Sequence, residues 1–297
     1  MGGQPGLSAT DLSLLRGART GMLAINAGRS PLVNPVAFHY AAGSVWMTTS
    51  RAAVKVSLLR RDPRGAFLVG ARDRYLLLQG VLEHFDPRSI SGQLRAVLNG
   101  PAFYLSLGGY AIKNAGFIGG YVLDVARIPR QWWPQNRVVL RMRPERAQWM
   151  AMEAPPSPGP AALPSAPIPL RRALSTVGVA HLCWSPDGRP TLSPALWSSR
   201  GPDPLVALPP GSLEEPAPPA AAALVVEAHH RFRATRMQGA CVRGVLKADA
   251  GATAEVGERY GLGSDAFGSG FVLRAGRVTW WKGFEIATLR RDPGASA

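Results

Sequence analysis

Two segments of this chain, about 160 residues apart, carry the same unusual combination of turn and strand. Each begins with a Gly-Arg turn and continues as an apolar strand with a central proline; the segments are Gly28–Phe38 and Gly188–Trp197. Repeats of solenoid proteins are shorter, roughly 20 to 50 residues, so this spacing indicates duplication of a whole small domain. Any site between the two copies would then be built from both.

A second pair of segments occurs in the same order in the two halves and supports this interpretation. Gly119–Leu123 is followed by a tryptophan pair at 132–133, and Gly268–Leu273 is followed by a pair at 280–281. We interpret each as a glycine-rich aromatic strand that leads to two tryptophans. The alternative is that short apolar strands bounded by glycine look alike in any protein rich in β-structure.

A run of prolines marks the boundary between the halves. Residues 153–170 contain seven prolines, which disfavour both helix and ladder pairing, so this run is interpreted as a semi-extended linker. We therefore expect a first domain over residues 1–152 and a second over 171–297. A further proline-rich stretch, 201–219, is interpreted as a long loop inside the second domain.

The composition is that of a folded protein outside the membrane. The apolar fraction of 46% is ordinary, and 297 residues leave room for two domains. No apolar run approaches the roughly 18 residues of a membrane helix, and the start lacks a signal-peptide layout, so we expect a cytoplasmic protein with no membrane contact. Cys183 and Cys241 stand alone, without metal or redox spacing, and are expected to be buried thiols.

The net charge of +15 raises the question of nucleic acid as a partner. Arginine supplies 30 of the 34 basic residues, and they are spread along the chain without a helix-turn-helix, zinc-finger or RNA-binding signature. Such arginine enrichment is also what a GC-rich genome produces. Nucleic acid binding is therefore not expected. Nucleophile elbows and P-loops are also absent from the sequence, which argues against hydrolytic or P-loop nucleotide chemistry.

The richest segment for chemistry follows the first Gly-Arg turn. Residues 32–40 and 44–49 are predicted to form a β-hairpin, followed by a helix over 50–61 with Ser50 as its N-cap. Asp62-Pro63 ends the helix. Two further strands are expected over 65–71 and 74–83.

The junction between strand and helix has the features of an anion site. Thr48, Thr49 and Ser50 place hydroxyls at the predicted helix start, where free N–H groups and the helix dipole favour a phosphate. Arg51 and Lys55 are four residues apart, hence on one side of a helix, and are able to close over the anion. The alternative is an ordinary capped helix with solvated basic residues.

The run from Gly28 to Phe85 resembles the pyridoxamine 5'-phosphate oxidase-like, FMN-binding split-barrel superfamily. The resemblance is carried by the Gly-Arg-Ser-Pro-Leu-Val-Asn-Pro-Val strand, Thr-Thr-Ser-Arg with Lys55, Leu-Leu-Arg-Arg-Asp-Pro at 58–63, and Gln79-Gly80. The second half is similar more weakly. The resemblance implies a mainly β protein with flanking helices (α+β), in which two six-stranded split barrels pack as an intramolecular pseudo-dimer. Split barrels of this family usually form homodimers with flavin between the subunits, so either a monomeric pseudo-dimer or a homodimer is expected.

The resemblance also implies roles for individual positions. The backbone of residues 34–36 (Asn34, Pro35 and Val36) would lie along the isoalloxazine ring, and Thr48, Thr49 and Ser50 would bind phosphate or ribityl oxygens. Arg51 and Lys55 would pair with the phosphate, and Tyr75 or Gln79 would approach from a neighbouring strand. Trp280 or Trp281 would cover the ring from the other half, although core or interface packing is the plainer interpretation of both tryptophans.

The second half departs from the family at the phosphate-binding position. Residues 209–216 contain three prolines and the two glutamates Glu214 and Glu215, which disfavour a helix and repel a phosphate. We therefore expect one cofactor per chain, anchored by the first half and covered by the second. The basic substrate-phosphate residues of true pyridoxamine phosphate oxidases cannot be placed, so activity on vitamin B6 is not expected.

Three cofactors are compatible with the resemblance: FMN, a deazaflavin and haem. Haem requires an axial ligand, and the chain has five histidines without metal-binding spacing: His39, His84, His181, His229 and His230. The leading hypothesis is an FMN- or deazaflavin-dependent oxidoreductase that acts on a small organic molecule. The alternatives are a non-catalytic flavin- or ligand-binding sensor and a haem-binding split barrel.

Overall fold

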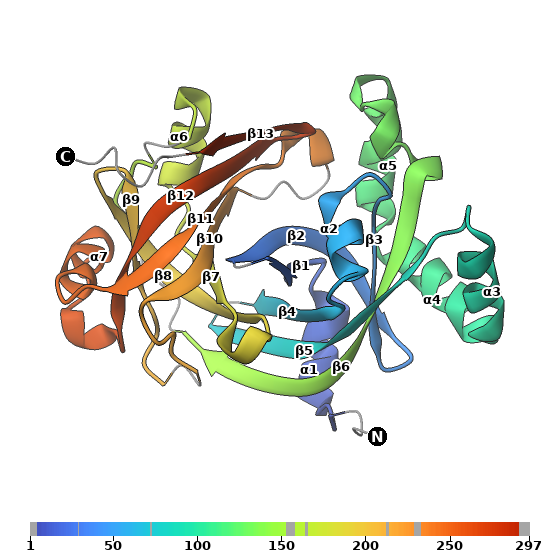
Figure 1. Ribbon diagram of the computed structural model, residues 1–297, viewed down its shortest axis with the longest axis horizontal. Helices are drawn as coiled ribbons and strands as arrows, with labels where there is room; N and C mark the ends of the chain where they lie inside the picture. Colours follow the sequence, from blue (N-terminus) through green and yellow to red (C-terminus); the bar gives the residue numbers. More distant parts are fainter. Residues whose placement is uncertain are drawn as a thin grey trace.

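The chain forms two barrels of antiparallel strands that lie side by side (Figure 1). This computed structural model describes residues 5–28, 30–71, 73–152, 158–163, 166–211, 214–228 and 233–290. The first barrel closes in the order β1-β2-β3-β6-β5-β4. Its strands are β1 (Thr20–Ala27), β2 (Ser30–Ala41), β3 (Ser44–Ser50), β4 (Arg64–Ala71), β5 (Arg74–Phe85) and β6 (Arg137–Ala151). The predicted hairpin and the two strands after it are confirmed.

The first barrel is filled by apolar side chains from alternate strand positions, as the pleat of a strand requires. Phe38 and Phe67 meet edge to face inside it, with ring centroids 4.9 Å apart. Helix α1 (Ala9–Gly17) adds Leu15 to this core and begins with a capping box formed by Ser8 and Asp11. The core therefore fixes which strand faces remain outside for binding.

Helical segments fill two connections of the first barrel. A short helix, α2 (Val54–Leu59), joins β3 to β4. Between β5 and β6 the chain forms α3 (Ile90–Leu98), α4 (Gly100–Lys113), α5 (Ala115–Leu123) and the three 3₁₀ turns η1 (Val125–Arg127), η2 (Arg130–Trp132) and η3 (Pro134–Asn136). Phe103 of α4 packs against Trp46 of β3, with ring centroids 5.7 Å apart, and so anchors this insertion to the outside of the barrel.

The second barrel repeats the strand order of the first. Pairing of β11 with β12 closes its sheet into the ring β7-β8-β9-β12-β11-β10, and one more strand extends it at β12. The strands are β7 (Ala180–Trp184), β8 (Thr191–Arg200), β9 (Asp203–Ala207), β10 (Ala220–Ala228), β11 (Gln238–Ala248), β12 (Gly270–Lys282) and β13 (Glu285–Arg290). Its helical elements are α6 (Ile168–Ser175), α7 (Ala252–Tyr260), η4 (Pro186–Gly188), η5 (Ala234–Arg236) and η6 (Ser264–Ala266).

Two further features recur at matching places of the barrels. The strand prolines Pro35 and Pro194 lie opposite Met22 and His181 in the first two strands of their barrels. A bulge interrupts each pairing of the fifth with the sixth strand, next to Gly80 and Gly244. A Cβ at either glycine would lie 1.9 Å from a carbonyl oxygen of the facing strand, so both bulges require glycine. The predicted pair of split barrels, packed as an intramolecular pseudo-dimer, is confirmed.

The second repeated landmark predicted from the sequence is wrong. Gly119–Leu123 belongs to helix α5, whereas Gly270 begins strand β12. The strand partner that corresponds to Trp281 is Met150, because Met150 pairs with Tyr75 of β5 as Trp281 pairs with Gly239 of β11. Small and apolar residues fit helix and strand equally well when the run is this short, so local sequence did not distinguish them.

The predicted linker is partly structured. Ala161, Leu163 and Ala166 are buried in the core of the second barrel, and α6 begins at Ile168 inside the predicted linker. Pro167 is the N-cap of this helix and a second proline lies in its first turn, where a missing N–H costs nothing. Prolines therefore start a helix here and do not prevent one. The division into domains at 152 and 171 stays a prediction.

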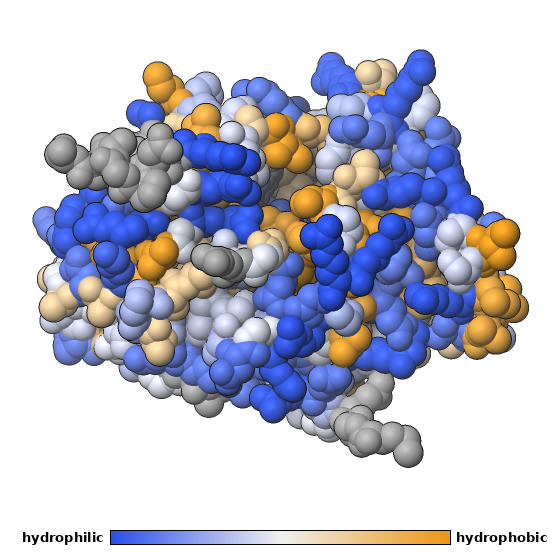
Figure 2. All heavy atoms as spheres, in the orientation of Figure 1, coloured by the Kyte–Doolittle hydropathy of each residue, from blue (hydrophilic) through white to orange (hydrophobic). Residues whose placement is uncertain are grey.

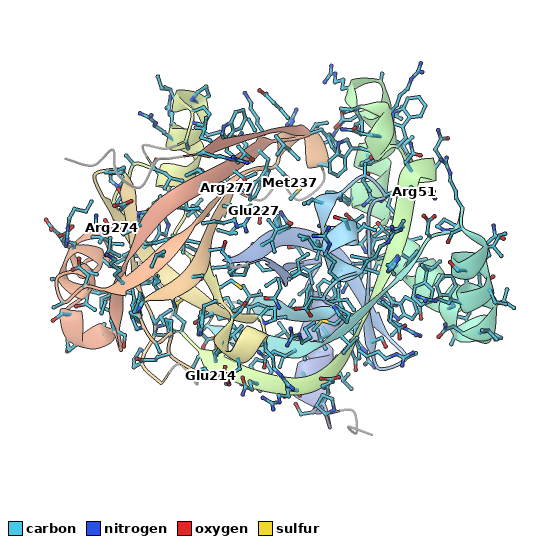
Figure 3. The ribbon with its side chains drawn as sticks, viewed as in Figure 1. Arg51, Glu214, Glu227, Met237, Arg274 and Arg277 are labelled. Atoms are coloured by element: carbon cyan, nitrogen blue, oxygen red, sulfur yellow. The ribbon has the colours of Figure 1, made fainter. Side chains whose placement is uncertain are left out.

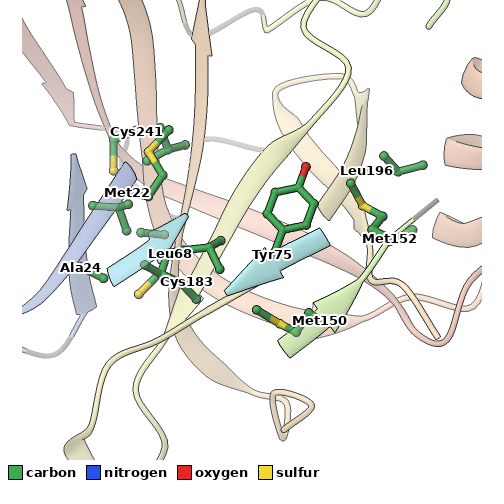
Figure 4. Close-up of a cluster of buried hydrophobic side chains, with 14 of the residues drawn as sticks. Met22, Ala24, Leu68, Tyr75, Met150, Met152, Cys183, Leu196 and Cys241 are labelled. Carbon is green, nitrogen blue, oxygen red and sulfur yellow. The ribbon is translucent and has the colours of Figure 1, made fainter. Parts of the chain in front are cut away.

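The two barrels share an apolar core that is rich in sulfur (Figure 4). Tyr75 and Trp281 belong to it, and its sulfur-containing members are Met22, Met150, Met152, Cys183 and Cys241. Both cysteines are free and buried, as predicted, and burial raises the pKa of the Cys241 thiol to about 11. No helix in the described part of the chain is long and apolar enough to cross a membrane.

Candidate functional site

A cavity of about 510 Å³ lies between the two halves. The first half contributes the segment around η1 and η2, and the second contributes η5 and the turn between β12 and β13; the lining residues are Arg127, Pro129, Thr235, Arg236, Lys282, Phe284 and Glu285. Figure 2 shows the surface hollowed between this turn and α5. Figure 3 shows Glu227, Met237 and Arg277 on the second half and Arg51 on the first, on the two sides of this boundary.

A group of cations lies on the first half where β3 ends. Lys55 of α2 is half-buried and makes no hydrogen bond or ion pair with any residue that the structure describes. Burial, and secondly the charge of Arg137, lower the pKa of Lys55 to about 8. Arg137 donates from Nε to Thr48 Oγ1 (3.0 Å) and from Nη2 to the Thr48 carbonyl (3.0 Å). The group therefore has an excess of positive charge and is suited to an anion.

Arg51 lies beside this group. It was predicted to pair with a phosphate, but its guanidinium already has a partner in the protein. Its guanidinium forms an ion pair with Asp86, and its backbone N–H donates to the Asn136 carbonyl at 2.8 Å. The Arg51 Nε is buried without a hydrogen-bond partner. An unpaired buried donor is costly, so this atom is available to a ligand oxygen.

The predicted N-cap at Ser50 is wrong. Ser50 is the last residue of β3 and pairs with Arg137, so its backbone belongs to the sheet, and α2 begins only after Ala53. The Ser50 hydroxyl donates to the Gln131 carbonyl (2.8 Å). Arg51 therefore lies outside the helix, and the two cations do not share a helical face. With only six residues, α2 provides no dipole of consequence, so an anion site here depends on side chains.

The three predicted hydroxyls do not form one cluster. Consecutive residues of a strand point to opposite faces, so Thr48 and Ser50 lie on one side of β3 and Thr49 on the other. Thr48 Oγ1 is 3.2 Å from the Tyr110 hydroxyl and also accepts from Arg137. Thr49 is buried. Only the Thr48 face is therefore brought directly to the Arg137 cation.

Strand β2 has an edge that its neighbour does not cover. Only residues 38–41 pair with β3, whereas 30–37 pair with β1 alone in the described sheet. Asn34, Pro35 and Val36 lie in this half-paired stretch. The stretch faces β10 and β11 of the second half.

Three other predicted residues lie elsewhere and join the halves. Gln79 Nε2 donates to the Pro190 carbonyl (2.9 Å) and to Thr191 Oγ1 (2.8 Å) of the second half. Tyr75 is buried in the shared core, and burial raises its pKa. Trp281 is also buried there and packs against Gly239. Among the described residues, no hydrogen bond joins these side chains to the cations around Lys55.

The matching connection of the second half contains carboxylates. No helix joins β9 to β10 within 208–211 and 214–219, the parts of this connection that the structure describes. Thr191 Oγ1 donates to Glu214 Oε2 (3.4 Å), and Ser269 Oγ donates to Glu215 Oε2 (2.5 Å). The two halves therefore present opposite charges at equivalent places.

The three histidines that the structure describes lie on three different strands, β2, β5 and β7. His39 lies beneath α4, where a Cβ at Gly109 would come within 2.4 Å of its Nε2, and burial lowers its pKa. Burial lowers the pKa of His181 to about 4. His84 lines a groove in the first half, and His229 and His230 lie outside the described residues. No group of three potential metal ligands occurs among the residues that the structure places.

Sequence reasoning missed the residues that close the site. Phe284, in the turn between β12 and β13, reaches the first half and meets Tyr121 (5.7 Å between centroids) and Trp132 (5.8 Å). Tyr121 donates its hydroxyl proton to the Trp132 carbonyl and has the Arg137 guanidinium 5.8 Å from its ring centre. The only sequence signal for Phe284 is its place in the Trp-Trp-Lys-Gly-Phe run; Arg137 was one arginine among many.

No family model and no curated protein matches this chain. Similar solved structures include a pyridoxamine 5'-phosphate oxidase-related FMN-binding protein from Nostoc punctiforme, which is 14% identical over 51% of this chain and 87% of that one (TM-score 0.35). A FAD-binding protein from Mesorhizobium loti is 18% identical over 48% of this chain and 94% of its own, with a TM-score of 0.32. An F420 reductase is 19% identical over 46% of this chain and 94% of its own, with a TM-score of 0.31.

Each of these matches spans about half of this chain and most of the other protein. At such identities the likeness concerns the fold alone. Within this chain itself, the same barrel strand order occurs twice.

Proposed function

We propose that this protein is an FMN- or deazaflavin-dependent oxidoreductase that acts on a small organic molecule and holds one cofactor between its halves. The observation that carries the proposal is Lys55, a half-buried cation without a partner among the described residues. A buried charge without a counter-charge is destabilising, so its presence is explained if a ligand supplies the missing anion. The phosphate of FMN or of a deazaflavin cofactor has that charge.

The surroundings of Lys55 fit a phosphate. Arg137 adds a second positive charge, and the Arg51 Nε offers a buried donor without a partner. The equivalent connection of the second half has Glu214 and Glu215 in place of these cations. This difference supports one cofactor per chain.

The half-paired stretch of β2 fits the other end of such a cofactor. Residues 34–36 lie in a stretch of β2 that pairs only with β1 among the described strands and that faces β10 and β11 of the second half. When bound, the cofactor would supply hydride chemistry, while the chain binds and orients it. Phe284, Tyr121 and Trp132 join the halves at the boundary and would limit access of water.

A titration with FMN and with riboflavin tests this proposal. Lys55→Ala should weaken FMN binding roughly 10- to 100-fold, because a charge-assisted contact to phosphate is lost. Riboflavin, which lacks the phosphate, should bind both proteins equally. Lys247→Ala removes the same charge from an exposed position on β11 and should change neither affinity.

Stoichiometry and turnover distinguish the alternatives. One FMN or deazaflavin per chain is expected, and two would show that the second half also binds. Reduction of the bound cofactor by a nicotinamide donor or by reduced substrate would support an oxidoreductase. Tight binding without any such reduction would favour the ligand-binding sensor. Equal FMN affinity of wild type and Lys55→Ala would refute the phosphate site.

A further inference from the structure

Helix α3 turns an apolar stripe toward solvent. Its outward residues follow helical spacing and are between 58% and 86% exposed; they are Ile90, Leu94, Val97 and Leu98. In a helix of a folded domain the apolar stripe normally faces the core. The stripe of α3 therefore has no partner among the residues that the structure describes.

Helix α4 extends the same exposed surface. Its inward face packs on the barrel through Phe103, Ser106 and Tyr110, whereas its outward side carries Tyr104, Leu105 and Ile112, which are 58% to 80% exposed. Figure 2 shows apolar side chains gathered at the right-hand edge of the molecule, over α3 and α4. Contiguous apolar surface of this kind marks an interaction site. We call these outward residues of the two helices the α3–α4 face.

The charges around the α3–α4 face are positive. Residues 87–123 contain no acidic side chain, and Arg88 and Arg95 are exposed within them. The nearest carboxylates along the chain are Asp86 and Asp124, which are buried and paired with arginines. The surface therefore combines apolar side chains with uncompensated basic ones.

A groove of about 540 Å³ opens beside the first turns of α3. Its polar lining includes Arg60, His84, Ser91 and Arg95, and its carboxylates are already paired with other arginines. Arg60 and Arg95 lower the pKa of His84, after burial as the first cause. Such a positive groove is suited to a phosphate group.

We propose that the α3–α4 face docks on the surface of an anionic phospholipid membrane. Its apolar side chains would enter the boundary between headgroups and acyl chains, and the arginines of the groove would bind a lipid phosphate. Helices with apolar and basic residues side by side bind membranes in this way. This interaction requires no spanning helix, and it departs from the sequence-based expectation of no membrane contact.

The shape and the charge of the face favour lipid over a second copy of the chain. α3 lies at the extremity of the molecule (Figure 1), so the apolar residues protrude and do not line a groove that would receive a partner's helix. A symmetric contact through this face would bring two copies of the same basic surface together. Each copy also carries a net charge of +15. An anionic surface attracts both the face and the whole molecule.

Vesicle sedimentation tests the proposal on the full chain. We expect the wild type to sediment with vesicles of phosphatidylcholine mixed with phosphatidylglycerol, and about tenfold less with phosphatidylcholine alone. Leu94→Ser together with Leu98→Ser should lower the partition coefficient roughly tenfold or more, because two apolar side chains no longer enter the lipid. Ile168→Ser, an equally exposed position on α6 of the second half, should leave it unchanged.

A second pair of variants tests the groove. Arg60→Ala together with Arg95→Ala should reduce binding to the phosphatidylglycerol vesicles and remove most of its dependence on salt. Unaltered far-ultraviolet circular dichroism and thermal unfolding establish that each variant folds. Absence of wild-type binding, or equal binding by Leu94→Ser/Leu98→Ser, overturns the proposal. Concentration-dependent dimers in sedimentation velocity that this double variant abolishes, without any vesicle binding, would assign the face to a second copy.

Discussion

The two barrels have the same strand order, but they differ in the connection from their third to their fourth strand. In the first, this connection is the short helix α2 with Lys55; in the second, it is a proline-rich loop with Glu214 and Glu215. Strand order and bulges are matters of backbone geometry, and both are repeated in the second barrel. The positive charge that a phosphate needs is present in the first barrel and is not repeated in the second. The comparison teaches that a scaffold and its site can diverge independently, and each variant below tests one side of it.

The bulge glycines should give the largest effect. Gly80→Ala and Gly244→Ala each place a methyl group 1.9 Å from a backbone carbonyl oxygen, which cannot move without disturbing the facing strand. We expect each substitution to lower the free energy of unfolding by about 3 kcal/mol. Urea unfolding followed by circular dichroism measures the loss.

Equal losses of unfolding free energy at the two bulges would show that both barrels keep the same backbone constraint, and unequal losses would show that they do not. Gly108→Ala is the control, because no atom lies within 4 Å of the added methyl group and alanine favours helix, so α4 should gain up to about 1 kcal/mol. A tolerated alanine at Gly244 alone would mean that the second barrel has relaxed the constraint that the first retains.

The repeated fold was largely predictable from sequence, but one of its landmarks was not. The alternation of the hairpin strands and the glycine turn at 41–43 are local signals, and the structure has that hairpin. The helical state of Gly119–Leu123 depends on its place after α4, packed beside the barrel, which no local pattern records. The two tryptophan pairs therefore occur in the same order along the sequence, but they do not occupy equivalent positions in the two barrels.

The two barrels should also differ in how their stability depends on pH, because the second has a buried histidine where the first has a methionine. His181 occupies the position opposite Pro194 that Met22 occupies opposite Pro35, and its Nδ1 is buried without a partner. Burial lowers the pKa of His181 from 6.5 to about 4, so the unfolded chain binds the proton more readily. Stability should be complete above pH 6.5 and fall by about 2 kcal/mol as the pH drops toward 4.

His181→Met copies the residue of the first half and should remove this dependence. The measurement is the difference in free energy of unfolding between wild type and variant at pH 7 and at pH 4.5. An unchanged difference at the two pH values would show that His181 does not titrate on unfolding as its burial implies.

Arg243 and Gln79 lie at equivalent bulges, and each forms hydrogen bonds to the other half. The two sets of hydrogen bonds should stabilise the protein to different extents. Arg243 donates from Nη2 to the Ala27 and Ser30 carbonyls and to the Ser30 hydroxyl (3.0 to 3.1 Å), whereas Gln79 makes two neutral hydrogen bonds. We expect Arg243→Met to cost about 2 kcal/mol and Gln79→Met about 1 kcal/mol, because charged donors make stronger bonds. Thermal unfolding of both variants gives the ranking, and the reverse order would place the stronger link on the Gln79 side.

The candidate site was predictable only where it lies in one local segment. Lys55 could be singled out because lysine is rare in this chain and because this lysine follows a run of hydroxyl residues. The cap at Ser50 was wrong because pairing with Arg137, far along the chain, commits that residue to the sheet. Phe284 comes from the other barrel altogether. Contacts of this kind arise from the packing of two domains, which spacing along one segment does not encode.

The smallest expected effect is a change in the free energy of unfolding when Lys55, the proposed phosphate ligand, is replaced. The pKa of Lys55 falls from 10.5 in the unfolded chain to about 8 in the folded protein, so unfolding takes up a proton between these values and stability rises with pH across that window. At neutral pH the charged lysine therefore destabilises the folded protein without cofactor. Lys55→Met should stabilise it by about 1 kcal/mol near pH 7, and this gain should disappear above pH 10.5.

Saturating FMN should reverse the order of the two proteins. A bound phosphate raises the pKa of Lys55 again, so the wild type gains more from the ligand than the variant does, by mass action on the folded state. Thermal unfolding at pH 7 with and without FMN measures both differences. A variant less stable than wild type without FMN would mean that an internal partner already compensates Lys55, and the contrast between the two barrels would then be one of packing and not of binding.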